Sequence, residues 1–246
     1  MPQDLREEPA SELLKRIATD REKLAALDRV VRRRQEGILL ANGSIEAMSL
    51  PNTWTWARFQ EIAKVLSNLV DPLSFKSYPH IAPDNIEGGT GKLLPYETIG
   101  ASGVFSAKHL FKAGCLLYSK IRPALAKVTV AEFDGLCSAD MYPIHAFIDR
   151  GYLQIYMLAE VFVRQSVSED NRVAMPKINQ ESLAKILVAV PPLSEQHRIT
   201  AKVGELMALC DRLEASLVAA TVTSGELLAV LLSESLMATA ERDKAA

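Results

Sequence analysis

A glycine-rich fragment, residues 87–92 (EGGTGK), is the part of the sequence closest to a catalytic motif. A turn that ends in Gly-Lys is typical of the P-loop, whose backbone N–H groups cradle the phosphates of a nucleotide. A P-loop also needs a glycine five positions before its second glycine, and a Ser or Thr after the lysine to bind magnesium. Ile86 and Leu93 occupy these two positions. The fragment therefore predicts an exposed turn and no nucleotide site.

The other groups that could do chemistry are scattered. Asp84 follows Pro83, but no Glu-x-Lys or Asp-x-Lys follows it up to Val128 to complete a nuclease metal site. The four histidines lie far apart and outside the H-E-x-x-H and G-x-S-x-G patterns. Leu193 follows the Pro-Pro pair where an adenine methyltransferase would place Tyr or Phe beside a flipped base. We therefore expect a chain that is not an enzyme and holds no metal and no cofactor.

Basic residues are concentrated in one segment. The whole chain has a net charge of −2, which argues mildly against a nucleic-acid binder, but residues 72–128 contain seven Lys or Arg and three acidic residues, a charge of +4. Four polar residues of this segment surround Pro123: Ser119, Lys120, Arg122 and Lys127. Arg can bind guanine O6 and N7 together, whereas Lys mainly holds phosphate. We predict DNA contacts here; the alternative is solvated strand ends or salt-bridge partners.

Three further loops supply polar side chains that could reach DNA. Loops are exposed, and their backbone can approach phosphate while their side chains reach base edges. The alternative for Lys177 is a helix cap or a contact with a neighbouring backbone. The candidates are Lys76, Tyr78 and His80 in the first loop, Asn85 and Lys92 in the second, and Arg172 and Lys177 in the third.

Composition is that of an ordinary soluble protein. The chain has 246 residues, of which 48% are hydrophobic and 24% charged, enough to bury a core in one or two domains. Its three cysteines form no C-x-x-C pair and are expected as free thiols. The N-terminus is polar and no apolar run approaches the roughly 20 residues that span a bilayer, so we expect a cytoplasmic location.

The elements that would position these residues fall into three parts. Residues 1–49 are expected to form a helix, capped by Ser11 and ending near Gly37, and then a linker around Asn42-Gly43. Residues 50–190 predict a mixed α+β domain, with a helix over 152–165. Its aromatic side chains are expected in the core. The predicted strands are residues 115–119, 126–130 and 186–190.

Residues 191–246 predict a long helix capped by Ser194, with Glu195 in its first turn. Apolar residues recur in steps of four and three, the heptad pattern of a coiled coil. Such a stripe needs another helix, either the N-terminal one or the same helix of a second chain. The stripe comprises Ile199, Val203, Leu206, Cys210, Leu213, Leu217, Leu227 and Leu231, with Ala220 and Ser224 between them.

Two segments resemble the specificity subunits of type I restriction-modification enzymes: residues 114–128 (GCLLYSKIRPALAKV), and residues 175–183 (MPKINQESL) running into 190–199 (VPPLSEQHRI). In that family a target recognition domain begins near Leu-Pro-x-x-Trp, as at Leu50 to Trp54, and ends at a Pro-Pro-Leu-x-Glu-Gln that starts a spacer helix. The usual member has two recognition domains and two antiparallel spacer helices. This chain has one of each, which resembles a half subunit.

The resemblance implies a non-catalytic subunit that reads one half of a bipartite DNA site. Methyltransferase subunits would modify the DNA and a motor-nuclease subunit would cleave it. With one recognition domain, the chain is expected to form a homodimer through the spacer helix. The alternative is a coiled-coil interaction protein whose α+β domain binds a protein or small ligand, which salt-dependent DNA affinity would distinguish.

Overall fold

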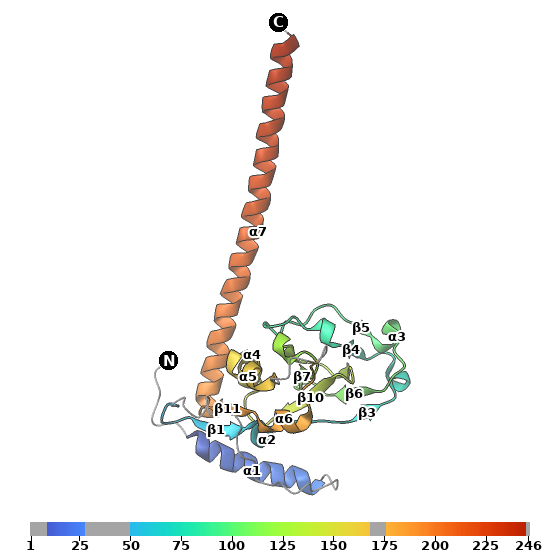
Figure 1. Ribbon diagram of the computed structural model, residues 1–246, viewed down its shortest axis with the longest axis vertical. Coiled ribbons are helices and arrows are strands. Elements are labelled where there is room, and N and C mark those ends of the chain that lie inside the picture. Colours follow the sequence, from blue (N-terminus) through green and yellow to red (C-terminus); the bar gives the residue numbers. More distant parts are fainter. Residues whose placement is uncertain (1–8, 28–49, 168–175, 245–246) are drawn as a thin grey trace. The chain divides into compact units, whose positions relative to one another are not determined.

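The computed structural model describes residues 9–27, 50–167 and 176–244, and the side chains of all of these except 22–27 and 230–244. The chain divides into two units, residues 1–199 and 200–246. The predicted linker over 37–49 lies outside the described residues, as does Arg172. The fold class is confirmed: a mixed α/β domain with a helix before it and a long helix after it (Figure 1).

The first helix, α1 (Ala10–Leu27), packs through one stripe. Ala10, Leu13 and Ile17 are buried, and their spacing of three and four places them on one face of the helix. The helix begins one residue before Ser11, and the carbonyl of Pro9 accepts the N–H of Glu12 at 3.0 Å. Ser11 therefore lies inside the helix, and its predicted role as the cap was wrong.

The sheets are small and mostly antiparallel. β1 (Thr55–Arg58) pairs with β11 (Leu187–Val190), with Thr55 opposite Val190. The two ends of the segment 55–190 therefore meet. The four-stranded sheet has the order β2 (Ala63–Val65), β10 (Met141–Ala146), β7 (Leu116–Ser119) and β8 (Val128–Val130). The five-stranded sheet has the order β3 (Leu69–Val70), β6 (Lys108–Phe111), β9 (Gly135–Cys137), β4 (Pro79–Ile81) and β5 (Glu97–Thr98).

Short helices lie between these strands, and a long helix follows the last strand. Three 3₁₀ turns each begin with proline, whose fixed φ suits the first helical position. They are η1 (Pro72–Phe75), η2 (Pro83–Asn85) and η3 (Pro123–Leu125). The α-helices are α2 (Phe59–Ile62), α3 (Ile99–Ser102), α4 (Arg150–Leu158), α5 (Glu160–Ser166), α6 (Gln180–Lys185) and α7 (Leu193–Lys244). The three predicted strands are confirmed as β7, β8 and β11.

The helix predicted over 152–165 is two helices. Ala159 between them is extended, with φ −70° and ψ 147°; its N–H ends α4, and its carbonyl accepts the N–H of Phe162, which begins α5. The break directs Phe162 into the core against Phe59 and Tyr118, with ring centroids 6.1 Å apart in both pairs. Tyr152 and Tyr156 are also buried, as predicted for these aromatic residues.

Strand β7 lies between the two hydrophobic cores. Side chains alternate along a strand, so every second residue faces the same side. Leu116 and Tyr118 belong to the core formed with α1, α4 and α5, whereas Leu117 belongs to the core of the five-stranded sheet. β7 is therefore held from both sides, which fixes the loop that follows it.

The start of α7 is locked to the domain by two buried polar residues. The Glu195 carboxylate accepts a hydrogen bond from Trp54 Nε1 at 3.1 Å. The fully buried Gln196 side chain accepts the N–H of Asp149 at 2.9 Å and donates to the carbonyl of Pro191 at 2.9 Å. Glu195 lies in the first turn as predicted, but the helix begins at Leu193, so Ser194 is not its cap.

Gln196→Ala is expected to lower the free energy of unfolding by about 1–3 kcal/mol, because it leaves a buried N–H and a buried carbonyl unpaired. Urea denaturation followed by circular dichroism measures this loss. Gln180→Ala is the matched control, since Gln180 is an exposed residue at the start of α6. An equal loss in both variants would contradict a structural role for Gln196.

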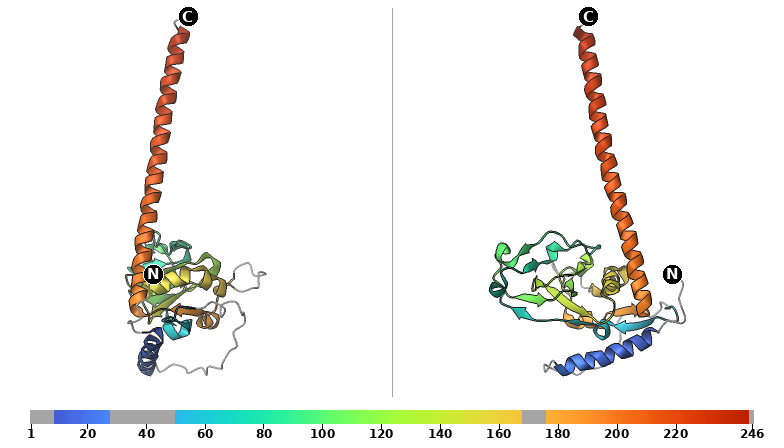
Figure 2. Two further views of the ribbon diagram at one scale, coloured as in Figure 1. Left: turned by 90° about the vertical axis from the view of Figure 1, so that its left-hand side faces the viewer. Right: turned by 180° about the vertical axis from the view of Figure 1, so that it is seen from behind.

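Helix α7 is continuous (Figure 2). In the second unit it carries an exposed apolar stripe. Leu206, Leu213, Leu217 and Leu227 are between 51% and 68% exposed. Ile199 instead packs against the first core, within the first unit. Leu231 belongs to the helix, but its side chain lies outside those described. Among the described residues, no helix is long and apolar enough to cross a membrane.

Candidate nucleic-acid interface

The structure separates the predicted DNA-contacting residues into two groups. Lys76 and Tyr78 lie in the turn between η1 and β4, and His80 lies on β4. The carbonyl of Lys76 accepts the N–H of Gly100 at 2.9 Å. The other described candidates lie on two loops that pack against each other, residues 83–94 and residues 119–127, or on the segment 176–178 beside them. We call residues 83–94 and 119–127 the paired loops.

Glycines allow the paired loops to approach closely. Gly89 donates its N–H to the carbonyl of Ala126 at 3.2 Å. A Cβ on Gly88 would lie 2.7 Å from the carbonyl oxygen of Leu125, and one on Gly91 would lie 2.5 Å from that of Val128. Gly91 also has φ +71°. The fragment that resembled a P-loop is thus a turn, exposed at residues 87–90, packed on the second loop.

Three polar candidates of the paired loops are engaged in hydrogen bonds that hold these loops in place. Asn85 accepts the N–H of Ala82 at 2.9 Å and donates to the carbonyl of Pro95 at 2.7 Å. Lys127 is mostly buried and donates to the carbonyl of Pro83 at 2.8 Å. Ser119, almost fully buried, donates to the carbonyl of Ile121 at 3.0 Å. Any contact of these three side chains with DNA stays a prediction.

Arg122 is exposed and has an unusual backbone. Its φ of +48° lies in the left-handed region, which is uncommon outside glycine, and its N–H donates to the carbonyl of Pro176 at 2.8 Å. Its guanidinium makes no hydrogen bond or ion pair with any residue that the structure describes. Lys92 is likewise exposed on the paired loops, and its ammonium makes no hydrogen bond or ion pair with any described residue. Within the paired loops, these two cations are the ones best placed to meet an anion.

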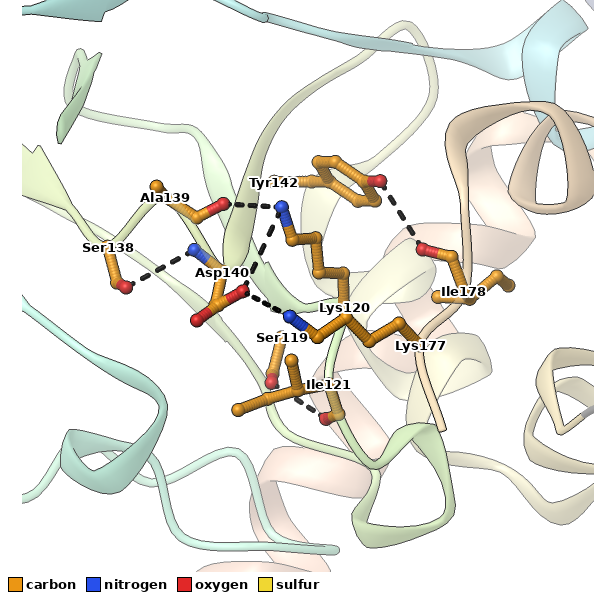
Figure 3. Close-up of polar contacts among 9 residues, drawn as sticks. All are labelled: Ser119, Lys120, Ile121, Ser138, Ala139, Asp140, Tyr142, Lys177 and Ile178. Atoms are coloured by element: carbon orange, nitrogen blue, oxygen red, sulfur yellow. Dashed lines mark hydrogen bonds and ion pairs between the residues drawn. The ribbon is translucent and has the colours of Figure 1, made fainter. Parts of the chain in front are cut away.

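Lys120 and Lys177 share one carboxylate (Figure 3). Lys177 Nζ lies 3.2 Å from Asp140 Oδ1, and Lys120 Nζ lies 3.9 Å from the same oxygen. Lys120 also donates to the carbonyl of Ala139 at 2.6 Å, and its Nζ lies 5.6 Å from the centroid of the Tyr142 ring. Lys120 is therefore held inside the fold more firmly than Lys177.

Burial favours uncharged groups deeper in the five-stranded sheet. Burial, and then the nearby charge of Lys108, lowers the pKa of His80, whose Nε2 is buried without a hydrogen-bond partner in the described structure. Burial likewise lowers the pKa of His109, with the charge of Lys120 adding to the effect. These histidines favour the neutral form, so they bring no positive charge to a DNA surface.

The three cysteines are free thiols, as expected, with Cys115 and Cys137 buried. Burial raises the pKa of Cys137 to about 12, which keeps it a thiol. Within the described ranges, no three His, Cys, Asp or Glu side chains gather into a group that could hold a metal ion.

Sequence reasoning missed the residues that organise the paired loops. Asp140 lies about 20 positions from Lys120 in the sequence, in a turn whose composition gives no sign of this partner. Pro176 and Ile178 flank Lys177 in the third candidate loop, but no role was predicted for either of them. The left-handed conformation of Arg122 could not be predicted, because a following proline favours extended backbone at that position.

Comparison with known proteins gives a consistent result. The type I restriction enzyme EcoDI specificity subunit of Escherichia coli is 48% identical over 169 residues, which cover 69% of this chain and 38% of that protein. The EcoAI specificity subunit of Escherichia coli is 26% identical over 229 residues, 87% of this chain and 38% of that protein. The chain thus spans 38% of the length of these relatives.

The fold also matches a solved structure. The crystal structure of the HsdS subunit from Thermoanaerobacter tengcongensis aligns with a TM-score of 0.59 and 22% identity, over 68% of this chain and 45% of that one. No protein-family model matches the sequence. The names of the curated relatives agree with the expectation that the chain is not an enzyme. Over the residues that match, the chain belongs to the family of type I restriction enzyme specificity subunits.

Proposed function

We propose that this chain reads one half of a bipartite DNA site for a type I restriction-modification complex, in the cytoplasm. The observation that carries the proposal is the 48% identity to a subunit named for specificity. The paired loops support it, because they expose Arg122 and Lys92, neither of which has a side-chain hydrogen bond or ion pair among the described residues. Arginine suits the bidentate reading of guanine, and lysine suits phosphate.

The partners follow from the same proposal. A methyltransferase subunit would supply the pocket for the flipped base, and a motor-nuclease subunit would cleave. The chain itself would contribute recognition and spacing, and would need no cofactor.

Two copies of the chain would associate through α7. The exposed stripe includes Leu206, Leu213 and Leu217, and a stripe of this kind needs a second helix to cover it. A two-fold dimer uses the same patch on both chains. Its two recognition domains would therefore read identical half-sites in inverted orientation, separated by unspecified bases.

The test is DNA binding by the full chain, alone and together with a type I methyltransferase subunit. Selection from a pool of random duplexes is expected to enrich one interrupted palindrome. Log affinity is expected to fall linearly with log salt, with a slope of about −0.9 for each phosphate contact. Affinity that does not depend on salt, or selection without any enriched sequence, would favour the coiled-coil interaction protein instead.

A further inference from the structure

The segment that follows β7 is paired like a strand with residues 176–178. Ile178 donates its N–H to the carbonyl of Lys120 at 2.9 Å, and Arg122 donates its N–H to the carbonyl of Pro176 at 2.8 Å. Ile121 and Lys177 form the bridge between these two bonds. Arg122 is thus held in its left-handed conformation by a second piece of chain that joins it from more than 50 positions away.

Asp140 ties these two pieces of chain together through their side chains. Its carboxylate lies 3.2 Å from Lys177 Nζ on one segment and 3.9 Å from Lys120 Nζ on the other (Figure 3). Tyr142, two residues further on, donates its hydroxyl to the carbonyl of Ile178 at 3.3 Å. Both lysines belong to the residue pairs whose backbones fix Arg122. The position of Arg122 therefore depends on a carboxylate that never needs to touch DNA.

The ion pair between Asp140 and Lys177 also affects the charge available at the surface. Lys177 is half exposed, and Asp140 is the one acid within ion-pair distance of it in the described structure. Lys120 has two further contacts, the carbonyl of Ala139 and the ring of Tyr142, so it stays in place without the acid. Loss of the Asp140 charge would therefore free Lys177 in particular for a phosphate.

We infer that Asp140 is a positioning residue that determines specificity: it fixes Arg122 for base reading and withholds Lys177 from the DNA backbone. This inference rests on the proposed function. Asp140 would then have two opposite effects on DNA binding. It would increase the discrimination between DNA sequences and lower the affinity for all of them. A residue that only stabilises the fold would change both quantities in the same direction.

Asp140→Asn is the direct test, because it removes the charge and keeps the shape. Non-specific affinity is expected to rise and the salt slope to steepen by about one phosphate contact. The ratio of affinities for the selected and a mismatched half-site is expected to fall about tenfold, the size of one good base contact. Adding Lys177→Gln is expected to restore the salt slope and leave the discrimination low.

Asp84→Asn is the matched control. Asp84 is fully exposed on the paired loops and lies 3.9 Å from Lys127 Nζ, so the variant makes the same change of charge, also beside a lysine. It is expected to leave the discrimination ratio unchanged. Equal loss of discrimination in both variants, or none in Asp140→Asn, would overturn the inference.

Hydrogen exchange in the free protein separates this inference from the proposed function. The amides of Arg122 and Ile178 are expected to exchange faster in Asp140→Asn, while the amides that pair β7 with β10 keep their rates. If the wild type bound no DNA, the proposed function would be rejected. Faster exchange at these two amides in Asp140→Asn would still uphold the positioning role. Unchanged exchange, with wild-type DNA binding intact, would reject the positioning role alone.

Discussion

Replacing both Leu213 and Leu217 with glutamate is expected to convert a dimeric protein into monomers. These side chains are 56% and 68% exposed in the single chain and lie one turn apart on α7. A second helix would bury them, and glutamates in that seam would be desolvated without partners. Light scattering measures the change of mass, and bipartite recognition is expected to be lost with it. The recognition domain should remain folded, as shown by an unchanged thermal transition.

Val218 and Val222 provide the matched control for this pair. They are 64% and 54% exposed and have the same spacing of four, but at 3.6 residues per turn each projects about 100° or more away from both Leu213 and Leu217. Val218→Glu with Val222→Glu is therefore expected to leave the dimer intact. A dimeric Leu213/Leu217 variant would contradict the model, as would a monomeric wild type that modifies an asymmetric site without a second specificity chain.

The second large effect is expected at the base-reading surface. Arg122→Ala together with Lys120→Ala is expected to weaken DNA binding and abolish modification of the site in the reconstituted complex. The cost is about 1–3 kcal/mol for a lost bidentate base contact. Competition binding against duplexes changed at single base pairs measures it, and methylation of the same duplexes gives the second readout.

Single variants divide this effect between the two residues. Arg122→Lys keeps the charge but loses the planar fork, so discrimination should fall while the salt slope stays unchanged. Lys92→Ala should weaken all duplexes alike and reduce the slope by about one phosphate contact. Unchanged binding and methylation in the double variant Arg122→Ala, Lys120→Ala would move the interface away from the paired loops.

The sequence predicted those parts of the fold that depend on local patterns. The runs at residues 115–119, 126–130 and 186–190 became β7, β8 and β11 because short apolar runs between turn residues favour strands. The long helix after the Pro-Pro pair was predicted from the heptad pattern of its apolar residues. The break at Ala159 could not be predicted, because neither glycine nor proline marks it and the gain comes from burying Phe162. The predicted caps Ser11 and Ser194 were both wrong. Each helix begins before its serine, with the carbonyl of Pro9 or Pro192 accepting an N–H of the first turn.

The candidate site was predictable by region but not by residue. The excess of Lys and Arg over residues 72–128 indicated the segment that forms most of the paired loops. Which of these cations are already engaged depends on distant partners, such as Asp140 for Lys120 and Pro83 for Lys127. Such contacts form only when the sheets bring the loops together, so the sequence offered Arg122, Lys120 and Lys127 as equals. The structure distinguishes them by exposure and by their contacts.

The most direct measurement is the pattern of modified bases in cells that carry this gene and a partner methyltransferase subunit. The account predicts methylation at an interrupted palindrome, present with the wild type and absent when this chain is deleted. Both copies of the chain carry the variant Arg122→Ala, so it should erase the methylation or relax the same base position in both inverted halves of the motif. Methylation that is unchanged without this chain, or a motif without two inverted halves, would contradict the account.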